Sequence, residues 1–184
     1  ESNYLHDGLV LFTYLHLAAD RPLTEQLLAS GTTALGYETV QLSSGMLPLL
    51  LPMSEVAGCL APQLGAYSLM KPHGGRGLLL GGVAGVKNPR VVVLGAGVAG
   101  QNAINVALGM GADVTVLDND LEKLRLIFWR YENRVQGIAS NTLTIREEVA
   151  GADMVIGAVL VPGSRTPKLV TNEMVAQMKP GSVL

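Results

Sequence analysis

The sequence contains little cysteine, few aromatic residues and little clustered charge. The single cysteine, Cys59, excludes an internal disulfide and a cysteine-rich metal site. Aromatic residues make up only 4% of the chain, and its 13 basic residues are outnumbered by 15 acidic ones. Proteins bind nucleic acids mainly through clustered lysine and arginine side chains, and the sequence has no such cluster. We therefore expect no nucleic-acid partner.

Long uncharged hydrophobic runs are also absent, although 48% of the residues are hydrophobic. A helix that crosses a bilayer needs about 20 consecutive apolar residues, and the most apolar region is interrupted at Lys87, Asn88, Pro89 and Arg90. Runs of Val and Leu are typical of strands that are buried on both faces of a parallel sheet. We therefore expect no membrane span and, because no signal peptide is recognisable, a cytoplasmic protein.

Predicted strands and helices alternate along the chain, which is the pattern of an α/β fold. Near the N-terminus, a buried strand at 9–15 and a second strand at 33–39 flank a short helix between Asp20 and Gly31. The glycine-rich stretch 73–85 is expected to be a loop. A longer series follows, with strands at 91–95, 113–118, 135–139 and 153–158 and helices near 98–110, 120–131, 144–150 and 171–178.

The segment between the two series indicates a linker and a helix. The proline-bounded stretch near 42–52 is the best candidate for a domain boundary. A helix follows from Ser54, its expected N-cap, to about Met70, and Pro62 is expected to kink it or to divide it into two. Because the chain begins with Glu1 and stops within KPGSVL, a turn that enters a strand, we expect a fragment of a longer protein.

The stretch RVVVLGAGVAG places Gly95, Gly97 and Gly100 in G-x-G-x-x-G spacing between a Val-rich strand and a helix. In this context the spacing is typical of dinucleotide binding. Gly95 permits the tight turn, Gly97 lets the backbone approach the pyrophosphate, and Gly100 lets the helix lie close to the strand. The N–H groups near Val98, at the start of the helix, offer donors and a positive dipole end to the phosphates.

A carboxylate, Asp118, ends the next predicted strand. It can accept hydrogen bonds from the adenosine ribose hydroxyls and would repel a 2′-phosphate, so NAD is favoured over NADP as the cofactor. A strand–helix turn that binds no ligand stays open as the alternative. The sequence predicts a Rossmann-type, doubly wound parallel sheet that binds NAD.

Three stretches go beyond a general NAD-binding pattern: LFTYLHLAAD, LPLLLPMSEVAG and IGAVLVPGSRTPKLVT. With YETV and GGRGLLLGGVAGV between them, they resemble bacterial L-alanine dehydrogenase over essentially the whole chain. This family is related to the NAD-binding subunit of proton-translocating transhydrogenase. The resemblance implies reversible, NAD-dependent deamination of L-alanine to pyruvate and ammonium by a homohexamer. It also implies that residues 1–48 are part of a second α/β domain, which holds the substrate, and that residues 49–184 are a truncated NAD-binding domain.

His16 matches the catalytic histidine of the family. Hydride transfer from the substrate and attack of water on the resulting imine each require a proton to be moved near neutral pH, which suits an imidazole. Without the resemblance, a histidine at the end of a buried strand is more often a packed core residue. With it, His16 is the predicted general acid and base.

The resemblance implies roles for further residues. Met53 would line the substrate pocket, with core packing as the alternative, and Ser54 would contact the cofactor phosphates. Lys123 would lie near the adenosine ribose, or remain a solvated charge on its helix. The other residues matched to cofactor contacts are Ser140, in a stretch that departs from the family pattern, and Val159 and Leu160 near the nicotinamide half.

Some functional residues of the family have no counterpart in this sequence. The substrate-binding arginine and lysine would precede Glu1 and the catalytic aspartate would follow Leu184, so we expect residues 1–184 alone to be inactive. Two alternatives stay open. One is a transhydrogenase NAD-binding subunit, which passes hydride to a partner and needs no substrate histidine. The other is a non-catalytic NAD-binding module.

Overall fold

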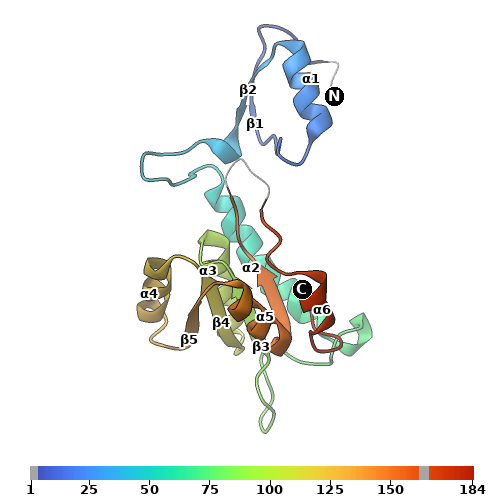
Figure 1. Ribbon diagram of the computed structural model, residues 1–184, viewed down its shortest axis with the longest axis vertical. Helices are drawn as coiled ribbons and strands as arrows, with labels where there is room; N and C mark the ends of the chain where they lie inside the picture. The colour runs from blue at the N-terminus through green and yellow to red at the C-terminus, as the bar shows by residue number, and fades with distance from the viewer. Residues whose placement is uncertain (1–3, 162–165) are drawn as a thin grey trace. The chain divides into compact units, whose positions relative to one another are not determined.

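The computed structural model describes residues 4–161 and 166–184 and divides into two compact units (Figure 1). Of the described residues, the first unit contains 4–53 together with 160–161 and 166–167. The second contains Ser54–Val159 and Lys168–Leu184. None of the described helices is long and apolar enough to cross a membrane.

The first unit is a β-α-β arrangement. β1 (Val10–Thr13) and β2 (Thr33–Gly36) pair in parallel, and α1 (Arg21–Ser30) connects them. The Asp20 carboxylate caps the first turn of α1 by accepting a backbone hydrogen bond, and Gly31 ends the helix in the left-handed conformation, with φ 71°. The predicted bounds of this helix are confirmed.

The two strands of this unit are shorter and less buried than the sequence predicts. β1 ends at Thr13, and β2 ends at Gly36, where the 3₁₀ helix Tyr37–Thr39 begins. Their side chains alternate between exposed and half-buried positions, as in a sheet covered on one face. Val10 is 64% exposed. The expectation of a buried strand at 9–15 was wrong, because an apolar run is buried only where both faces of the sheet are covered.

α2 (Leu51–Ser68) is one continuous helix. It begins before Ser54 and has Pro52 in its first turn, where the missing proline N–H leaves no helical hydrogen bond unmade. The expectation that Ser54 is the N-cap was therefore wrong. The helix also continues through Pro62, so the proline does not divide it.

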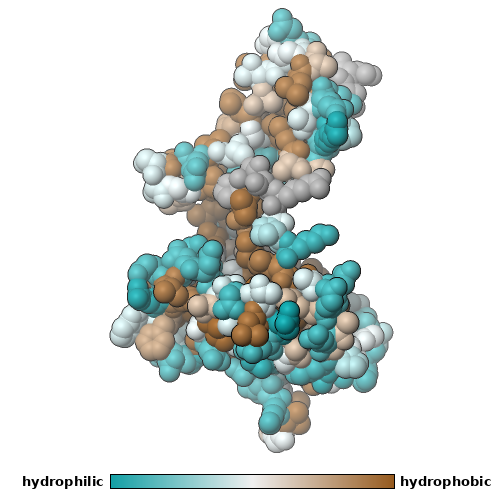
Figure 2. Space-filling model, viewed as in Figure 1, coloured by the Kyte–Doolittle hydropathy of each residue, from teal (hydrophilic) through white to brown (hydrophobic). Residues whose placement is uncertain are grey.

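α2 carries part of the hydrophobic content of the chain at its surface. Val56, Leu60, Leu64 and Tyr67 are exposed at helical spacing along it, and Figure 2 shows hydrophobic residues over this helix. Buried strands therefore account for only part of the hydrophobic fraction of the sequence.

Among the described residues, the second unit contains a four-stranded parallel sheet in the order β5-β4-β3-β6. The chain passes outward from β3 through β4 to β5 and then returns to the other side of β3 to form β6, which confirms the doubly wound α/β fold. The strands are β3 (Arg90–Leu94), β4 (Asp113–Asp118), β5 (Val135–Ala139) and β6 (Met154–Gly157). Besides most of α2, the helices of this unit are α3 (Val98–Gly109), α4 (Leu121–Arg130), α5 (Thr142–Gly151) and α6 (Asn172–Ala176).

The central strand β3 is buried on both faces, as its Val-rich sequence predicts. Val91 and Val93 pack into one hydrophobic cluster with Ile104 of α3, whereas Val92 packs into a second cluster with Val149 of α5. Because helices cover both sides, β3 is held rigidly. The loop that follows it therefore leaves the sheet from a fixed point.

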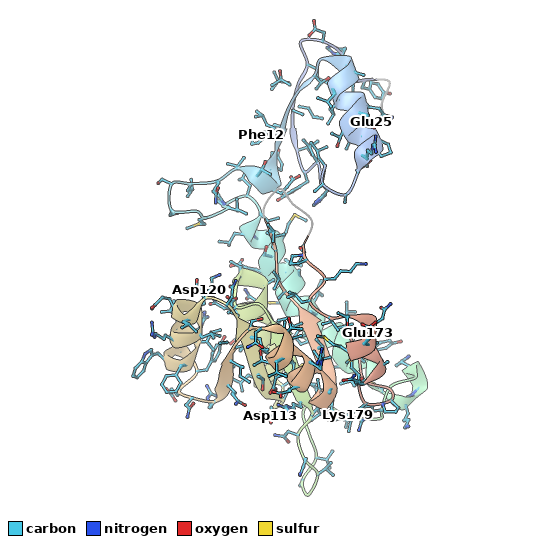
Figure 3. The ribbon with its side chains drawn as sticks, in the orientation of Figure 1. Phe12, Glu25, Asp113, Asp120, Glu173 and Lys179 are labelled. Carbon is cyan, nitrogen blue, oxygen red and sulfur yellow. The ribbon has the colours of Figure 1, made fainter. Side chains whose placement is uncertain are left out.

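The last described residues lie beside β6. Val183 forms a parallel bridge with Met154, which confirms that KPGSVL leads into the sheet. The buried Asp153 carboxylate pairs with Lys179 Nζ at 3.0 Å and with Arg76 Nε at 3.2 Å (Figure 3 labels Lys179). This carboxylate thus ties the glycine-rich loop and the C-terminal turn to the sheet.

Candidate functional site

The glycine loop begins where β3 ends, next to the end of β6. Gly95 has φ 107°, a conformation that L-residues rarely adopt. A Cβ atom on Gly95 would lie 2.7 Å from the Ala158 carbonyl oxygen and 3.0 Å from Val159 Cγ2. Glycine is required here both by the backbone conformation and by the close approach of the chain that leaves β6.

Gly100 and Gly97 meet different requirements. A Cβ atom on Gly100 would lie 1.8 Å from the Gly95 carbonyl oxygen, so only glycine lets α3 lie this close to the loop. Around Gly97, the first residue before α3, a Cβ atom would meet no described atom within 4 Å. α3 begins at the next residue, and the first N–H groups of a helix have no acceptor within it. The arrangement suits an anion that approaches the backbone.

Asp118, at the end of β4, binds the backbone of this loop. It is only 8% exposed, and its Oδ2 accepts a hydrogen bond from the Ala96 N–H over 2.6 Å. Its Oδ1 accepts from the Asp120 N–H over 2.9 Å. Each carboxylate oxygen can accept a further hydrogen bond. Asp118 can therefore hold the glycine loop and still accept from a ribose hydroxyl.

Gln101, in the first turn of α3, binds the carbonyl group of Ala96, the loop residue whose N–H group donates to Asp118. Its Nε2 donates to the Ala96 carbonyl oxygen over 3.0 Å, and its Oε1 accepts from Arg130 Nη1 over 3.0 Å. The Tyr131 hydroxyl donates to the Gln101 carbonyl oxygen over 3.2 Å. The backbone of Ala96 is thus fixed at its N–H group by Asp118 and at its C=O group by Gln101.

We expect the Gln101→Leu variant to bind NAD about five- to tenfold more weakly, because a hydrogen bond of this kind contributes about 1 kcal/mol. Isothermal titration of the chain with NAD measures the change. Gln63→Leu is the matched control, since Gln63 is exposed on α2 and donates to the Cys59 carbonyl oxygen of its own helix. Equal Kd values for the two variants would show that Gln101 has no part in shaping the loop.

Three further predicted residues lie near this edge of the sheet. The Ser140 N–H donates to the Asp118 carbonyl oxygen over 2.9 Å, which places Ser140 at the end of β5 beside the end of β4. Val159 follows β6 and lies against Gly95. Lys123 lies in the first turn of α4, where its Nζ is 3.8 Å from Asp120 Oδ2 (Figure 3 labels Asp120). Residues at the carboxyl ends of all four strands thus lie around the glycine loop. Open α/β sheets bind ligands at this edge.

In the first unit, His16 follows β1 in an unusual backbone conformation. Its φ is 50°, in the left-handed region, which costs a non-glycine residue about 1–3 kcal/mol and persists where the surrounding structure holds it. The side chain is exposed, and the imidazole lies nearly parallel to the Tyr14 ring, with 6.2 Å between ring centroids. The His16 N–H donates to Glu38 Oε1 over 2.7 Å. His16 is therefore not a packed core residue.

The Glu38 carboxyl carries a lowered pKa. Burial acts to raise it, but hydrogen bonds from the N–H groups of Glu38, His16 and Leu15, together with the charge on His16, outweigh burial and lower the pKa. Because the folded pKa lies below the unfolded one, ionised Glu38 stabilises the fold above its unfolded pKa. That stabilisation is lost as the pH falls through the folded pKa.

We expect the free energy of unfolding of Glu38→Gln to fall below that of the wild type at neutral pH and to approach it in acid. The two should converge below the usual glutamate pKa, about 4.3. Urea unfolding at a series of pH values measures this. Glu25→Gln is the control, because Glu25 is exposed on α1 and pairs with Arg21 of the same helix (Figure 3 labels Glu25). A pH-independent difference for Glu38→Gln would contradict the lowered pKa.

Comparison with known protein families decides the identity. Residues 61–184 match the family model "Alanine dehydrogenase/PNT, C-terminal domain", and residues 1–57 match "Alanine dehydrogenase/PNT, N-terminal domain". The chain belongs to the alanine dehydrogenase/PNT family. The resemblance inferred from the sequence is thus confirmed.

Individual members of the alanine dehydrogenase/PNT family match the whole chain. An alanine dehydrogenase from Mycolicibacterium smegmatis is 58% identical over 100% of this chain and 50% of its own length. A solved L-alanine dehydrogenase structure superposes with a TM-score of 0.87 and 50% identity, over 100% of this chain and 51% of its own. A transhydrogenase structure from Sinorhizobium meliloti is 25% identical, with a TM-score of 0.76 over 100% of this chain and 55% of its own. The chain spans about half the length of the curated relatives that it matches.

The remaining predicted residues of this alanine dehydrogenase/PNT chain lie in α2 and after β6. Ser54 is half-buried, one turn before Gly58, where a Cβ atom would lie 2.2 Å from the Ala99 carbonyl oxygen of α3. α2 therefore packs closely against the first turn of α3, near the glycine loop. Met53 is 45% exposed and Leu160 57% exposed, and both group with the first unit. The functional roles of all these residues stay predictions.

Sequence reasoning missed Gln101 and Glu38 as functional candidates. Both are ordinary polar residues whose partners, Ala96 and the N–H groups at the end of β1, become visible only in the folded chain. The one sequence signal was that Glu38 lies in YETV, a stretch that resembles the family.

Proposed function

We propose that this chain is the NAD-binding domain and part of the substrate domain of an NAD-dependent L-alanine dehydrogenase. The reaction is the reversible deamination of L-alanine to pyruvate and ammonium. The observation that carries the proposal is the match of 50% or more to proteins named alanine dehydrogenase along the whole chain. A homohexamer, a cytoplasmic location and a role in amino-acid catabolism belong to the same proposal and rest on the family likeness.

The geometry around the glycine loop supports NAD as the cofactor. The open side of Gly97 and the N–H groups that start α3 would hold the pyrophosphate. Asp118 would accept from the adenosine ribose and disfavour a 2′-phosphate. Ser54 and Lys123 would bind the phosphates and ribose, Ser140 would lie near the adenine end, and Val159 and Leu160 would contact the nicotinamide half. When bound, NAD accepts a hydride from the substrate.

The proposed contribution of the first unit is proton transfer. The His16 imidazole would take up and release the protons that accompany loss of the amino group and addition of water. Its exposure leaves it accessible to a substrate, and its fixed backbone holds it in one place. Met53, near the start of α2, would line the substrate pocket.

The second candidate is the NAD-binding subunit of a transhydrogenase, which the 25% identical structure supports less strongly. Such a subunit would transfer hydride to a partner and need no proton from His16. A non-catalytic NAD-binding module is the third candidate. All three require NAD binding, so binding alone does not separate them.

Two measurements test the proposal. Isothermal titration of the chain compares NAD with NADP, and we expect NAD to bind more tightly because the Asp118 carboxylate would repel a 2′-phosphate. NADH formation from L-alanine, measured on the family-length protein that contains this chain, then separates a dehydrogenase from the other candidates. Binding of NADP equal to that of NAD, or NADH formation that does not depend on L-alanine, would refute the proposal.

A further inference from the structure

The Glu38 side chain reaches from the 3₁₀ helix Tyr37–Thr39 to the end of β1. Its Oε1 accepts from the His16 N–H over 2.7 Å and from the Leu15 N–H over 3.1 Å, and its Oε2 accepts from Leu15 over 3.3 Å. Leu15 is buried, with 7% exposed. One carboxylate thus binds two consecutive backbone N–H groups directly at the proposed catalytic residue.

This pairing is linked to the unusual conformation of His16. Successive N–H groups converge on one anion in concave turns that contain a left-handed residue, and His16 is left-handed, with φ 50°. Without an acceptor, no hydrogen bond would stabilise the convergence of the Leu15 and His16 N–H groups. Residue 16 would then relax toward the conformations that histidine prefers, and the imidazole would point elsewhere.

The neighbouring residues hold Glu38 in place. The Tyr37 ring packs edge-on against Phe12, at 4.4 Å between centroids, and against Tyr14, at 5.0 Å (Figure 3 labels Phe12). A Cβ atom on Gly36 would lie 3.2 Å from the carboxylate carbon and oxygens of Glu38, so the missing side chain of Gly36 leaves room for the carboxylate. Elements of both strands therefore fix the acceptor.

We propose that Glu38 is a positioning residue that sets the direction of the His16 imidazole by holding the backbone of residues 15 and 16. This inference rests on the proposed function only in giving His16 a catalytic role. Glu38 orients His16 through the position of its acceptor oxygen, whereas its charge stabilises the fold.

Three variants separate position from charge. Glu38→Gln keeps one acceptor oxygen at the reach of Oε1, which binds both N–H groups, but it removes the charge and replaces Oε2, the more distant acceptor, with an NH2 group. Glu38→Asp keeps the charge but is one methylene shorter, so it cannot reach both N–H groups. Glu38→Ala removes both. In the family-length protein, we expect Glu38→Gln to keep kcat for alanine oxidation within about threefold. Glu38→Asp and Glu38→Ala should lower kcat by about 10- to 100-fold, since small misplacements cost this much, without changing the KM for NAD.

The reverse order, with Glu38→Asp active and Glu38→Gln impaired, would overturn the proposal in favour of a charge effect. Unchanged kcat in all three variants would also overturn it. Amide hydrogen exchange gives a readout that needs no activity. The Leu15 and His16 amides should exchange faster in Glu38→Asp and Glu38→Ala than in Glu38→Gln, and equal rates in the three variants would overturn the proposal. If His16→Asn leaves kcat intact, the catalytic role of His16 fails, whereas the exchange rates still test Glu38.

Discussion

The Gly100→Ala variant is expected to lose NAD binding and stability together. Its Cβ atom would lie 1.8 Å from the Gly95 carbonyl oxygen and 2.9 Å from the carbonyl carbon, distances at which one backbone segment must move. α3 would shift away from the loop, and with it the N–H groups that start the helix. We expect the Kd for NAD to rise at least about 100-fold and the free energy of unfolding to fall by about 1–3 kcal/mol.

Gly109→Ala is the matched control for this variant. Gly109 is the last residue of the same helix, and a Cβ atom there would meet no described atom within 4 Å. Alanine is the better helix former, so the control should bind NAD normally and be no less stable. Isothermal titration and thermal unfolding of both variants give the comparison. A wild-type Kd in Gly100→Ala would mean that the glycine loop does not bind the cofactor.

The His16→Asn variant is expected to lose alanine oxidation while it keeps NAD binding. Asparagine adopts the left-handed conformation more readily than most residues, so the backbone at φ 50° should be preserved. What disappears is the proton-transfer group, and general acid–base catalysis contributes about 10²- to 10⁴-fold to rate. We expect kcat to fall within that range in the family-length protein, with the Kd for NAD unchanged.

His6→Asn is the control for the histidine substitution. His6 lies in the same unit, is exposed, and its ring contacts only the neighbouring Asp7 carbonyl oxygen among the interactions of the described residues. It should leave kcat at the wild-type value. If both variants kept full activity, another group would have to transfer the proton. His16 would then have no catalytic role, despite its match to the family histidine.

Local sequence patterns were sufficient to predict most of the fold. The bounds of the strands around the glycine loop and the Asp20 cap of α1 follow from alternation, capping chemistry and glycine spacing, which act over a few residues. The start of α2 was missed because Ser54 is a good N-cap by type, whereas Pro52 fits the first turn equally well and begins the helix earlier. Local preference alone cannot choose between two permitted starts.

The contacts that shape the site could not be predicted in the same way. The sequence indicated that Asp118 could bind a ribose. It did not indicate that the Asp118 carboxylate, at the end of β4, accepts from the Ala96 N–H, which follows the neighbouring strand β3. Glu38 reaches His16 across the paired strands of the first unit, and such partners depend on register and side-chain direction. A polar residue in the sequence indicates that a hydrogen bond is needed, but not where its partner lies.

The stoichiometry of NADH formation by the family-length protein, supplied with only L-alanine and NAD, tests the proposed reaction most directly. We expect NADH, pyruvate and ammonium to appear in equal amounts, and pyruvate with ammonium to consume NADH in the reverse direction. A protein that binds NAD but forms no NADH from L-alanine, and passes hydride only to a partner subunit, would contradict the proposed reaction.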